Sequence, residues 1–171
     1  MNKFRLRFNP AEIKTLSARF EYGSDSEIIK KIFPRVKKNG FINKKDFLAI
    51  CEWKTPRSKP LCRKNSPALI KKITGISLAT KDEKEKIEIL LTLCGVGWPT
   101  ASTILHFVSG FKYPVLDYRA IWSLNAKVPA KYTFDFWNDY TLYSRKIAKE
   151  NKVSLRVLDK ALWQYSAENQ G

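Results

Sequence analysis

The sequence contains little cysteine and a single histidine. Its three cysteines, Cys51, Cys62 and Cys94, are widely spaced, and no two of them form a CxxC pair. Such spacing argues against a zinc ribbon and against a four-cysteine iron–sulfur cluster, and it is typical of reduced thiols in a cytosolic protein. We therefore expect a cytoplasmic protein that requires no redox cofactor and no iron–sulfur cluster.

Acidic residues are also scarce. The chain of 171 residues has 16 Asp and Glu against 32 Lys and Arg, which gives a formal net charge of +16. An excess of this size opposes compaction, and it favours a polyanionic partner, either a nucleic acid or an anionic membrane surface. A generally basic, solubilising surface is the simpler alternative. The first ten residues, MNKFRLRFNP, are basic but lack the apolar segment of a secretion signal, so we expect no export.

Helical periodicity runs through most of the chain, and convincing β-strand alternation is absent. Four polar residues are typical of helix starts: Asn9, Asn43, Ser66 and Thr80. Pro34 is expected to break a helix, and Gly75 to end one. Residues 54–67 hold three prolines among five basic residues, which predicts a loop. The predicted fold class is all-α, with about eight or nine helices.

The helices are expected to form two small lobes with a cleft between them. Residues 1–22 and 128–171 would make up the first lobe, and residues 23–127 the second. The loop NAKVPAKYT, at residues 125–133, would separate the closing helices from the part of the chain that precedes it.

One stretch, LLTLCGVGWPTASTILHFVSGF from Leu90 to Phe111, contains no charged residue. It reaches the length of a membrane span, about 20 residues, but Gly95-Val96-Gly97-Trp98-Pro99 interrupts it. Two helices joined by a tight turn are therefore predicted, and no membrane span. Both glycines are expected to accept positive φ, while Val96 anchors the turn and backbone N–H groups face outward. Together with the helix dipole these groups suit a phosphate, although glycines that merely turn the chain are an alternative.

The pattern LxGVGxxTAxxILxFxxGxxYPVLDYR, which runs from Leu93 to Arg119, resembles the helix-hairpin-helix and following loop of a DNA glycosylase superfamily. Endonuclease III, the adenine-mismatch glycosylases and the alkylbase glycosylases are typical members. The resemblance covers about 27 residues. It places a hairpin at residues 89–108 and a catalytic loop at residues 112–119. The protein would be a compact member without an iron–sulfur cluster.

The resemblance implies that Asp117 is the catalytic residue. In the family's chemistry a carboxylate stabilises the oxocarbenium-like sugar of a flipped-out nucleotide and orients the attacking water. An N-cap for the next helix is the ordinary role of an aspartate at this position, and both roles can coexist. The implied activity is excision of a damaged or mispaired base from duplex DNA by a monomer, nucleoid-associated if the source is prokaryotic.

The sequence departs from the family at Pro99. Members that also cleave the strand carry a nucleophilic lysine at this position, so the resemblance implies a glycosylase without lyase activity. The main rival is a helix-hairpin-helix protein that recognises bent or damaged DNA without catalysis. A basic protein that binds RNA or an anionic membrane surface is a further alternative.

The remaining candidate residues fall into three groups. The predicted DNA contacts are Gly95, Val96, Gly97, Trp98, Thr100, Lys54, Arg57 and Lys59. The predicted base pocket comprises Trp53, Trp98 and Tyr118. A monovalent cation, K+ or Na+, could bind to the main-chain carbonyls of Leu91, Leu93 and Val96. His106 is expected to pack within its helix, and Cys94 to be a small buried thiol.

Overall fold

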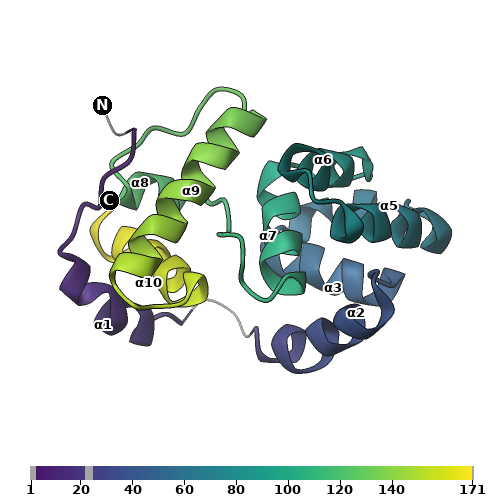
Figure 1. Cartoon of the computed structure of the whole chain (residues 1–171), viewed down its shortest axis with the longest axis horizontal. Coiled ribbons are helices and arrows are strands. Elements are labelled where there is room, and N and C mark those ends of the chain that lie inside the picture. Colours follow the sequence, from purple (N-terminus) through teal and green to yellow (C-terminus); the bar gives the residue numbers. More distant parts are fainter. Residues whose placement is uncertain (1–2, 22–24, 171) are drawn as a thin grey trace. The chain divides into compact units, whose positions relative to one another are not determined.

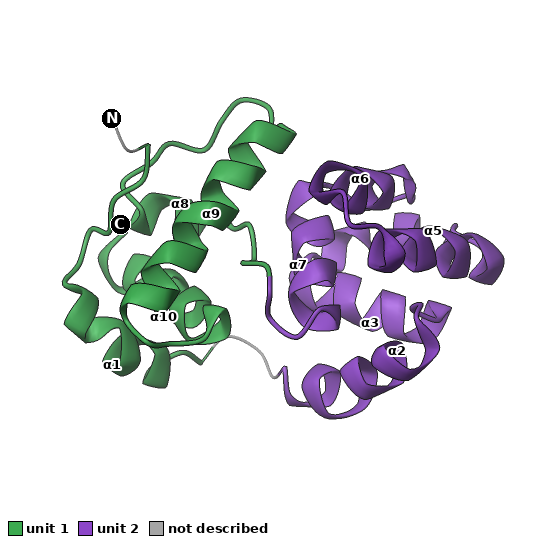
Figure 2. Ribbon diagram, viewed as in Figure 1, with its two compact units in different colours: residues 1–22, 113–171 green, residues 23–112 purple. Residues whose placement is uncertain are grey.

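The computed structural model describes residues 3–21 and 25–170, and within these ranges every regular element is helical. The prediction of an all-α fold is therefore confirmed. The chain divides into two compact units (Figure 2): residues 1–22 with 113–171 form unit 1, and residues 23–112 form unit 2. The division falls after Lys112. As a result the Leu93–Gly97 turn belongs to unit 2, whereas Asp117 belongs to unit 1.

Unit 2 is built around helix α7, Trp98–Val108, which packs against α2, α3 and α6 (Figure 1). Nine of the eleven residues of α7 are buried, which accounts for the absence of charge in this part of the sequence. The other elements of unit 2 are η2 (Ile28–Ile32), α2 (Phe33–Asn39), α3 (Lys44–Lys54), η3 (Pro56–Ser58), α4 (Lys59–Cys62), α5 (Pro67–Ala79), α6 (Glu83–Glu88) and η4 (Ile89–Thr92).

Unit 1 contains η1 (Pro10–Glu12), α1 (Ile13–Ala18), α8 (Tyr118–Ser123), α9 (Phe134–Glu150) and α10 (Leu155–Asn169). Helix α10 packs against α1, α8 and α9. Phe4 and Phe8 of the N-terminal segment are buried beside aromatic residues of α9 and α10, whereas Arg5 and Arg7 between them are exposed. Alternation of this kind is the pattern of an extended segment with one buried side.

Three of the four predicted helix starts are confirmed. The side chains of Asn9, Asn43 and Ser66 each accept a hydrogen bond from a backbone N–H in the first turn that follows. The fourth prediction was wrong, because Asp82 and not Thr80 caps α6. The Asp82 carboxylate accepts hydrogen bonds from two backbone N–H groups, so it satisfies more of the free donors at the helix start than a single hydroxyl could.

Three predictions about helix boundaries were also wrong. Pro34 does not break its helix, because the π-helical turn η2 precedes it and joins directly to α2. A π turn widens the backbone just where the proline ring would otherwise meet the carbonyl four residues earlier. Gly75 lies inside α5, which continues to Ala79. Residues 54–67 are not a loop throughout, since η3 and α4 lie within them.

The cysteines occupy different environments. Cys51 and Cys62 are fully buried in unit 2, and burial raises the pKa of the Cys51 thiol, which makes it a poor nucleophile. Cys94 is exposed, so the expectation of a buried thiol at this position was wrong. Within the described residues, no helix is both long enough and apolar enough to cross a membrane.

Candidate functional site

The turn between η4 and α7, at Leu93–Gly97, packs closely against helix α4 at Gly95. Gly95 adopts a left-handed conformation with φ of 79°, which an L-amino acid with a side chain rarely adopts. A Cβ atom at this position would lie 2.8 Å from both the backbone nitrogen and the Sγ atom of Cys62. Gly95 is therefore needed for two reasons, its backbone conformation and its contact with α4.

The buried side chain of Asn65 fixes the same turn through three hydrogen bonds. Its Oδ1 accepts from the N–H of Cys94, and its Nδ2 donates to the carbonyls of Cys94 and Cys62, each at 2.9 Å. The amide thus binds both polar backbone groups of one turn residue. Sequence reasoning missed this role, because nothing in the local pattern indicates that Asn65 and Cys94 are neighbours.

Gly97 does not share the conformation of Gly95. Its φ of −98° and ψ of −179° are open to any residue, so the prediction of positive φ at Gly97 was wrong. The nearest atom to an added Cβ would be Cδ of Pro99 at 3.8 Å, an ordinary contact. Gly97 is exposed. Gly97 is, however, the N-cap of α7, a position at which glycine is more favourable than alanine, and the absence of a side chain also leaves room for a ligand to approach the backbone.

The start of α7 presents free hydrogen-bond donors. Among the described residues, no hydrogen bond of the chain uses the backbone N–H of Gly97, Trp98 or Thr100, and Pro99 has no N–H to offer. The side chain of Val96 is buried and anchors the turn, as predicted. Donors at the positive end of a buried eleven-residue helix suit an anion.

The predicted basic loop is only partly available to a ligand. Lys59 forms an ion pair with Glu52, while Arg57 is exposed and Lys54 is half-buried. Trp53 packs edge-on against Phe107, with ring centroids 4.9 Å apart. This contact gives Trp53 an ordinary packing role within unit 2.

The carbonyls proposed for a monovalent cation are also partly engaged, since that of Leu93 accepts the N–H of Val96 at 3.1 Å. The cation stays a prediction. In the part of the chain that the structure describes, no three His, Cys, Asp or Glu side chains gather as metal ligands would.

His106 packs within α7, as expected. Its side chain is fully buried beside Phe107 and Phe111.

Asp117 caps helix α8 in unit 1. Its Oδ1 accepts from the N–H of Arg119 at 2.9 Å, and the residue is half-buried. The segment before it is fixed by Tyr140, a fully buried residue of α9 whose hydroxyl donates to the carbonyl of Val115 at 2.8 Å. The carboxylate is thus held in a defined position, which a positioned catalytic group requires.

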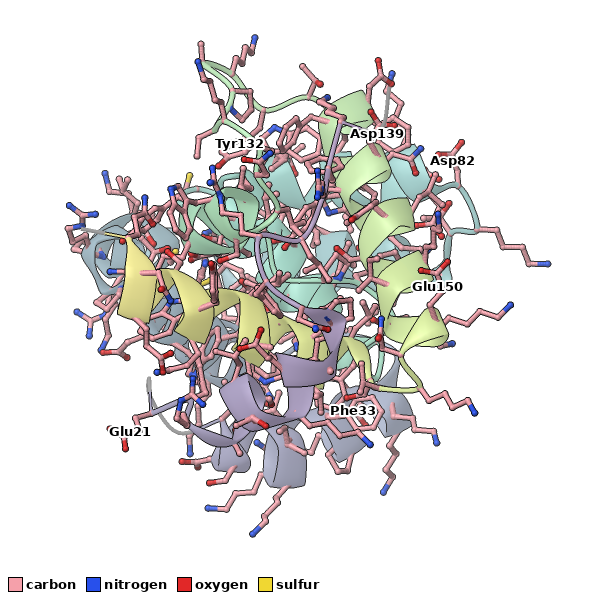
Figure 3. The ribbon with its side chains drawn as sticks, turned by 90° about the vertical axis from the view of Figure 1, so that its left-hand side faces the viewer. Glu21, Phe33, Asp82, Tyr132, Asp139 and Glu150 are labelled. Atoms are coloured by element: carbon pink, nitrogen blue, oxygen red, sulfur yellow. The ribbon has the colours of Figure 1, made fainter. Side chains whose placement is uncertain are left out.

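One aromatic residue that the sequence did not single out, Tyr132, lies near enough to Asp117 to sense its charge. Partial burial raises the pKa of Tyr132, and the negative charge of Asp117 raises it further. Tyr132 lies on the loop that leads into α9, the helix that carries Asp139 and Glu150 (Figure 3). Since Tyr132 lies fifteen positions after Asp117 in an irregular loop, no periodicity could have linked the two.

Tyr118, the residue predicted for the base pocket, is 52% exposed, and the Arg119 guanidinium lies 5.3 Å from its ring. Trp98 is half-buried at the start of α7. Trp53 and Trp98 belong to unit 2, whereas Tyr118 belongs to unit 1 with Asp117 and Tyr132.

Comparison of the chain with family models, with curated proteins and with solved structures found no match. The case for a function therefore depends on the residues and on the geometry within each unit.

Proposed function

We propose that the protein is a monofunctional DNA glycosylase. It would hydrolyse the N-glycosidic bond of a damaged or mispaired base that has been flipped out of duplex DNA. The observation that carries the proposal is the turn before α7, where a left-handed Gly95, an extended and exposed Gly97 and unused N–H donors occur together. The order of these features along the chain agrees with the family pattern that runs from Leu93 to Arg119 and includes Asp117.

The turn would bind the DNA backbone. The donors of Gly97, Trp98 and Thr100 suit the oxygens of a phosphate, and in this role they would contact no base. Such a grip is independent of DNA sequence, as a repair enzyme requires. The net charge of +16 supports a polyanionic partner as well.

Asp117 would act on the sugar. In the proposed step the bond from C1′ to the base nitrogen breaks, and its electron pair leaves with the base, which gains a proton from solvent. The carboxylate stabilises the oxocarbenium-like sugar and accepts a proton from the water whose oxygen bonds to C1′. The products are a free base and an abasic site. The reaction needs no redox cofactor.

Strand cleavage is not part of the proposed activity, because Pro99 offers no amine for a Schiff base. Borohydride treatment of the protein with its substrate is expected to trap no covalent adduct. A trapped adduct would show that a lysine elsewhere in the chain acts as the nucleophile.

The grip on DNA is tested by Gly97→Ala. The new methyl group meets no protein atom closely, but alanine is a poorer N-cap than glycine, so the free energy of unfolding should fall by about 1 kcal/mol or less and the fold should be kept. A methyl group between the turn and a phosphate should weaken binding to duplex DNA by about tenfold, because charge-assisted hydrogen bonds would lengthen or break. Equal affinity of variant and wild type would remove the turn from the interface.

The activity is tested by a panel of duplexes that carry alkylated, oxidised or deaminated bases or mismatches, each scored for abasic sites. Release of one chemical class of base would support the enzyme and identify its substrate. A specific observation favours the rival, a DNA-binding protein without catalysis, because Asp117 already has the ordinary role of an N-cap. Tight binding to the panel without release of any base would favour that rival.

A further inference from the structure

Unit 1 contains a polar recess of about 310 Å³, and none of the residues that the sequence analysis proposed lines it. Its lining residues are Arg5, Leu6, Arg7, Trp122, Asn125 and Tyr165. No aspartate or glutamate is among them.

The recess forms where the N-terminal segment lies along the end of α8. The N–H groups of Arg5 and Arg7 donate to the carbonyls of Leu124 and Ser123, each at 2.9 Å. Arg5 and Arg7 are two positions apart, and both line the recess. The buried Phe4 anchors this arrangement.

Arg7 is oriented by the aromatic residues of the recess. Its Nε donates to the carbonyl of Trp122, and its guanidinium lies 4.4 Å from the centroid of the Trp122 ring. Trp122 stacks on Tyr165, whose hydroxyl donates to the carbonyl of Arg7 at 3.3 Å. These contacts restrict the guanidinium before any ligand binds, which lowers the entropy cost of binding.

Arg5 and Arg7 have no acidic partner within residues 3–21 and 25–170. Among the described residues, no ion pair involves Arg5 or Arg7, whereas Lys3 lies 3.7 Å from Asp139 and Arg19 lies 2.8 Å from Glu168. Two guanidinium groups at one acid-free recess offer planar sets of N–H donors that match phosphate oxygens.

We propose that this recess binds a phosphate of the DNA backbone, so that unit 1 holds the duplex independently of the turn in unit 2. This inference rests on the proposed duplex partner but not on catalysis. Phosphate recognition here would be independent of sequence, as it would be at the turn.

The test compares Arg5→Gln with Lys14→Gln in the full chain. Both residues are exposed in unit 1, and each substitution removes one positive charge, but Lys14 lies on α1 outside the recess. Arg5→Gln is expected to weaken binding to an undamaged duplex by about tenfold and to reduce the slope of log affinity against log salt by about one. Lys14→Gln should change both quantities much less.

Equal effects of the two substitutions would overturn the proposal, because they would reduce the recess to general surface charge. Unchanged DNA affinity in Arg5→Gln would also overturn it. If that variant then lost binding to a free deoxynucleoside monophosphate, the recess would take a small phosphate and not the duplex.

An undamaged duplex keeps this result separate from the enzyme. If Arg5→Gln lost affinity for the undamaged duplex while the wild type released no base, the phosphate site in the recess would be supported and the glycosylase refuted. If instead the wild type released a base, and Arg5→Gln bound the undamaged duplex as tightly as the wild type, the glycosylase would be supported and the recess refuted.

Discussion

The two glycines of the turn illustrate how one residue type can serve two physical purposes. The sequence predicts the same positive φ for both, yet only Gly95 adopts it. Gly95 is required by the protein, through its backbone conformation and its contact with Cys62. Gly97 is the N-cap of α7 and has an extended backbone that other residues can adopt, so the protein requires a glycine there less strictly than at position 95, and its small size would suit the close approach of a ligand. The spacing of the motif could predict the turn but not this division of roles.

The role of Gly95 can be measured against Gly40, which has a similar φ of 74° but open space around its Cα. Gly40→Ala should lose about 1 kcal/mol of unfolding free energy, the cost of a left-handed alanine. Gly95→Ala should lose at least about 1 kcal/mol more, since its Cβ would overlap the backbone of α4. Denaturant unfolding of both variants checks this. Equal losses would show that contact with Cys62 is unimportant.

At the scale of the helices, the sequence predicted most starts and few ends. Three helix starts could be predicted from the caps Asn9, Asn43 and Ser66, because a cap is a local interaction made within a few residues of the chain. The effects of Pro34 and Gly75 depend on their surroundings, a π turn in one case and a helix that continues past the glycine in the other. Local rules misjudge such positions because tertiary packing overrides weak propensities.

The hydrogen bonds from Asn65 to the Leu93–Gly97 turn are expected to stabilise the fold. Asn65→Ala removes three hydrogen bonds and should lower the unfolding free energy by about 1–3 kcal/mol, because the groups it satisfies are partly buried. Asn151→Ala, which removes one bond to the carbonyl of Ile147, is the matched control and should cost less. Chemical denaturation of the two variants makes the comparison. A loss no larger than that of the control would contradict the role of Asn65 in holding the turn.

Helices α1 and α10 are joined by a pair of hydrogen bonds from Arg19 to Glu168, each at 2.8 Å. Arg19 lowers the pKa of Glu168 to about 2 from an ordinary 4.5, and Gln164 contributes. Because the folded pKa lies below the unfolded one, the stabilisation is present above pH 4.5 and is lost as the pH falls towards 2.

Glu168→Gln should therefore be less stable than the wild type at pH 6, and the difference should vanish near pH 2. The effect is small, since both side chains are substantially exposed and solvent screens the pair. Unfolding curves at pH 6, 4 and 2 provide the measurement. A difference that did not change with pH would show that the ion pair does not stabilise the fold.

For the whole molecule, helical periodicity predicted the all-α class and composition predicted a basic surface, because both signals are sums over many residues. Composition could not reveal that the turn and Asp117 belong to different compact units, or that Tyr140 fixes the segment before Asp117. Nor could it indicate the recess at Arg5 and Arg7, which forms only when residues more than a hundred positions apart meet. Those features depend on long-range contacts, which a local pattern does not encode.

The most direct test of the account is the rate of base release under saturating protein for wild type, Asp117→Asn and Asp82→Asn. Asparagine retains the N-cap at both positions, since its side-chain oxygen can accept the same N–H bonds. We expect Asp117→Asn to bind the damaged duplex as the wild type does but to release the base at least about a hundredfold more slowly. Asp82→Asn should match the wild type. Equal rates for all three proteins would show that the Asp117 carboxylate takes no part in the chemistry.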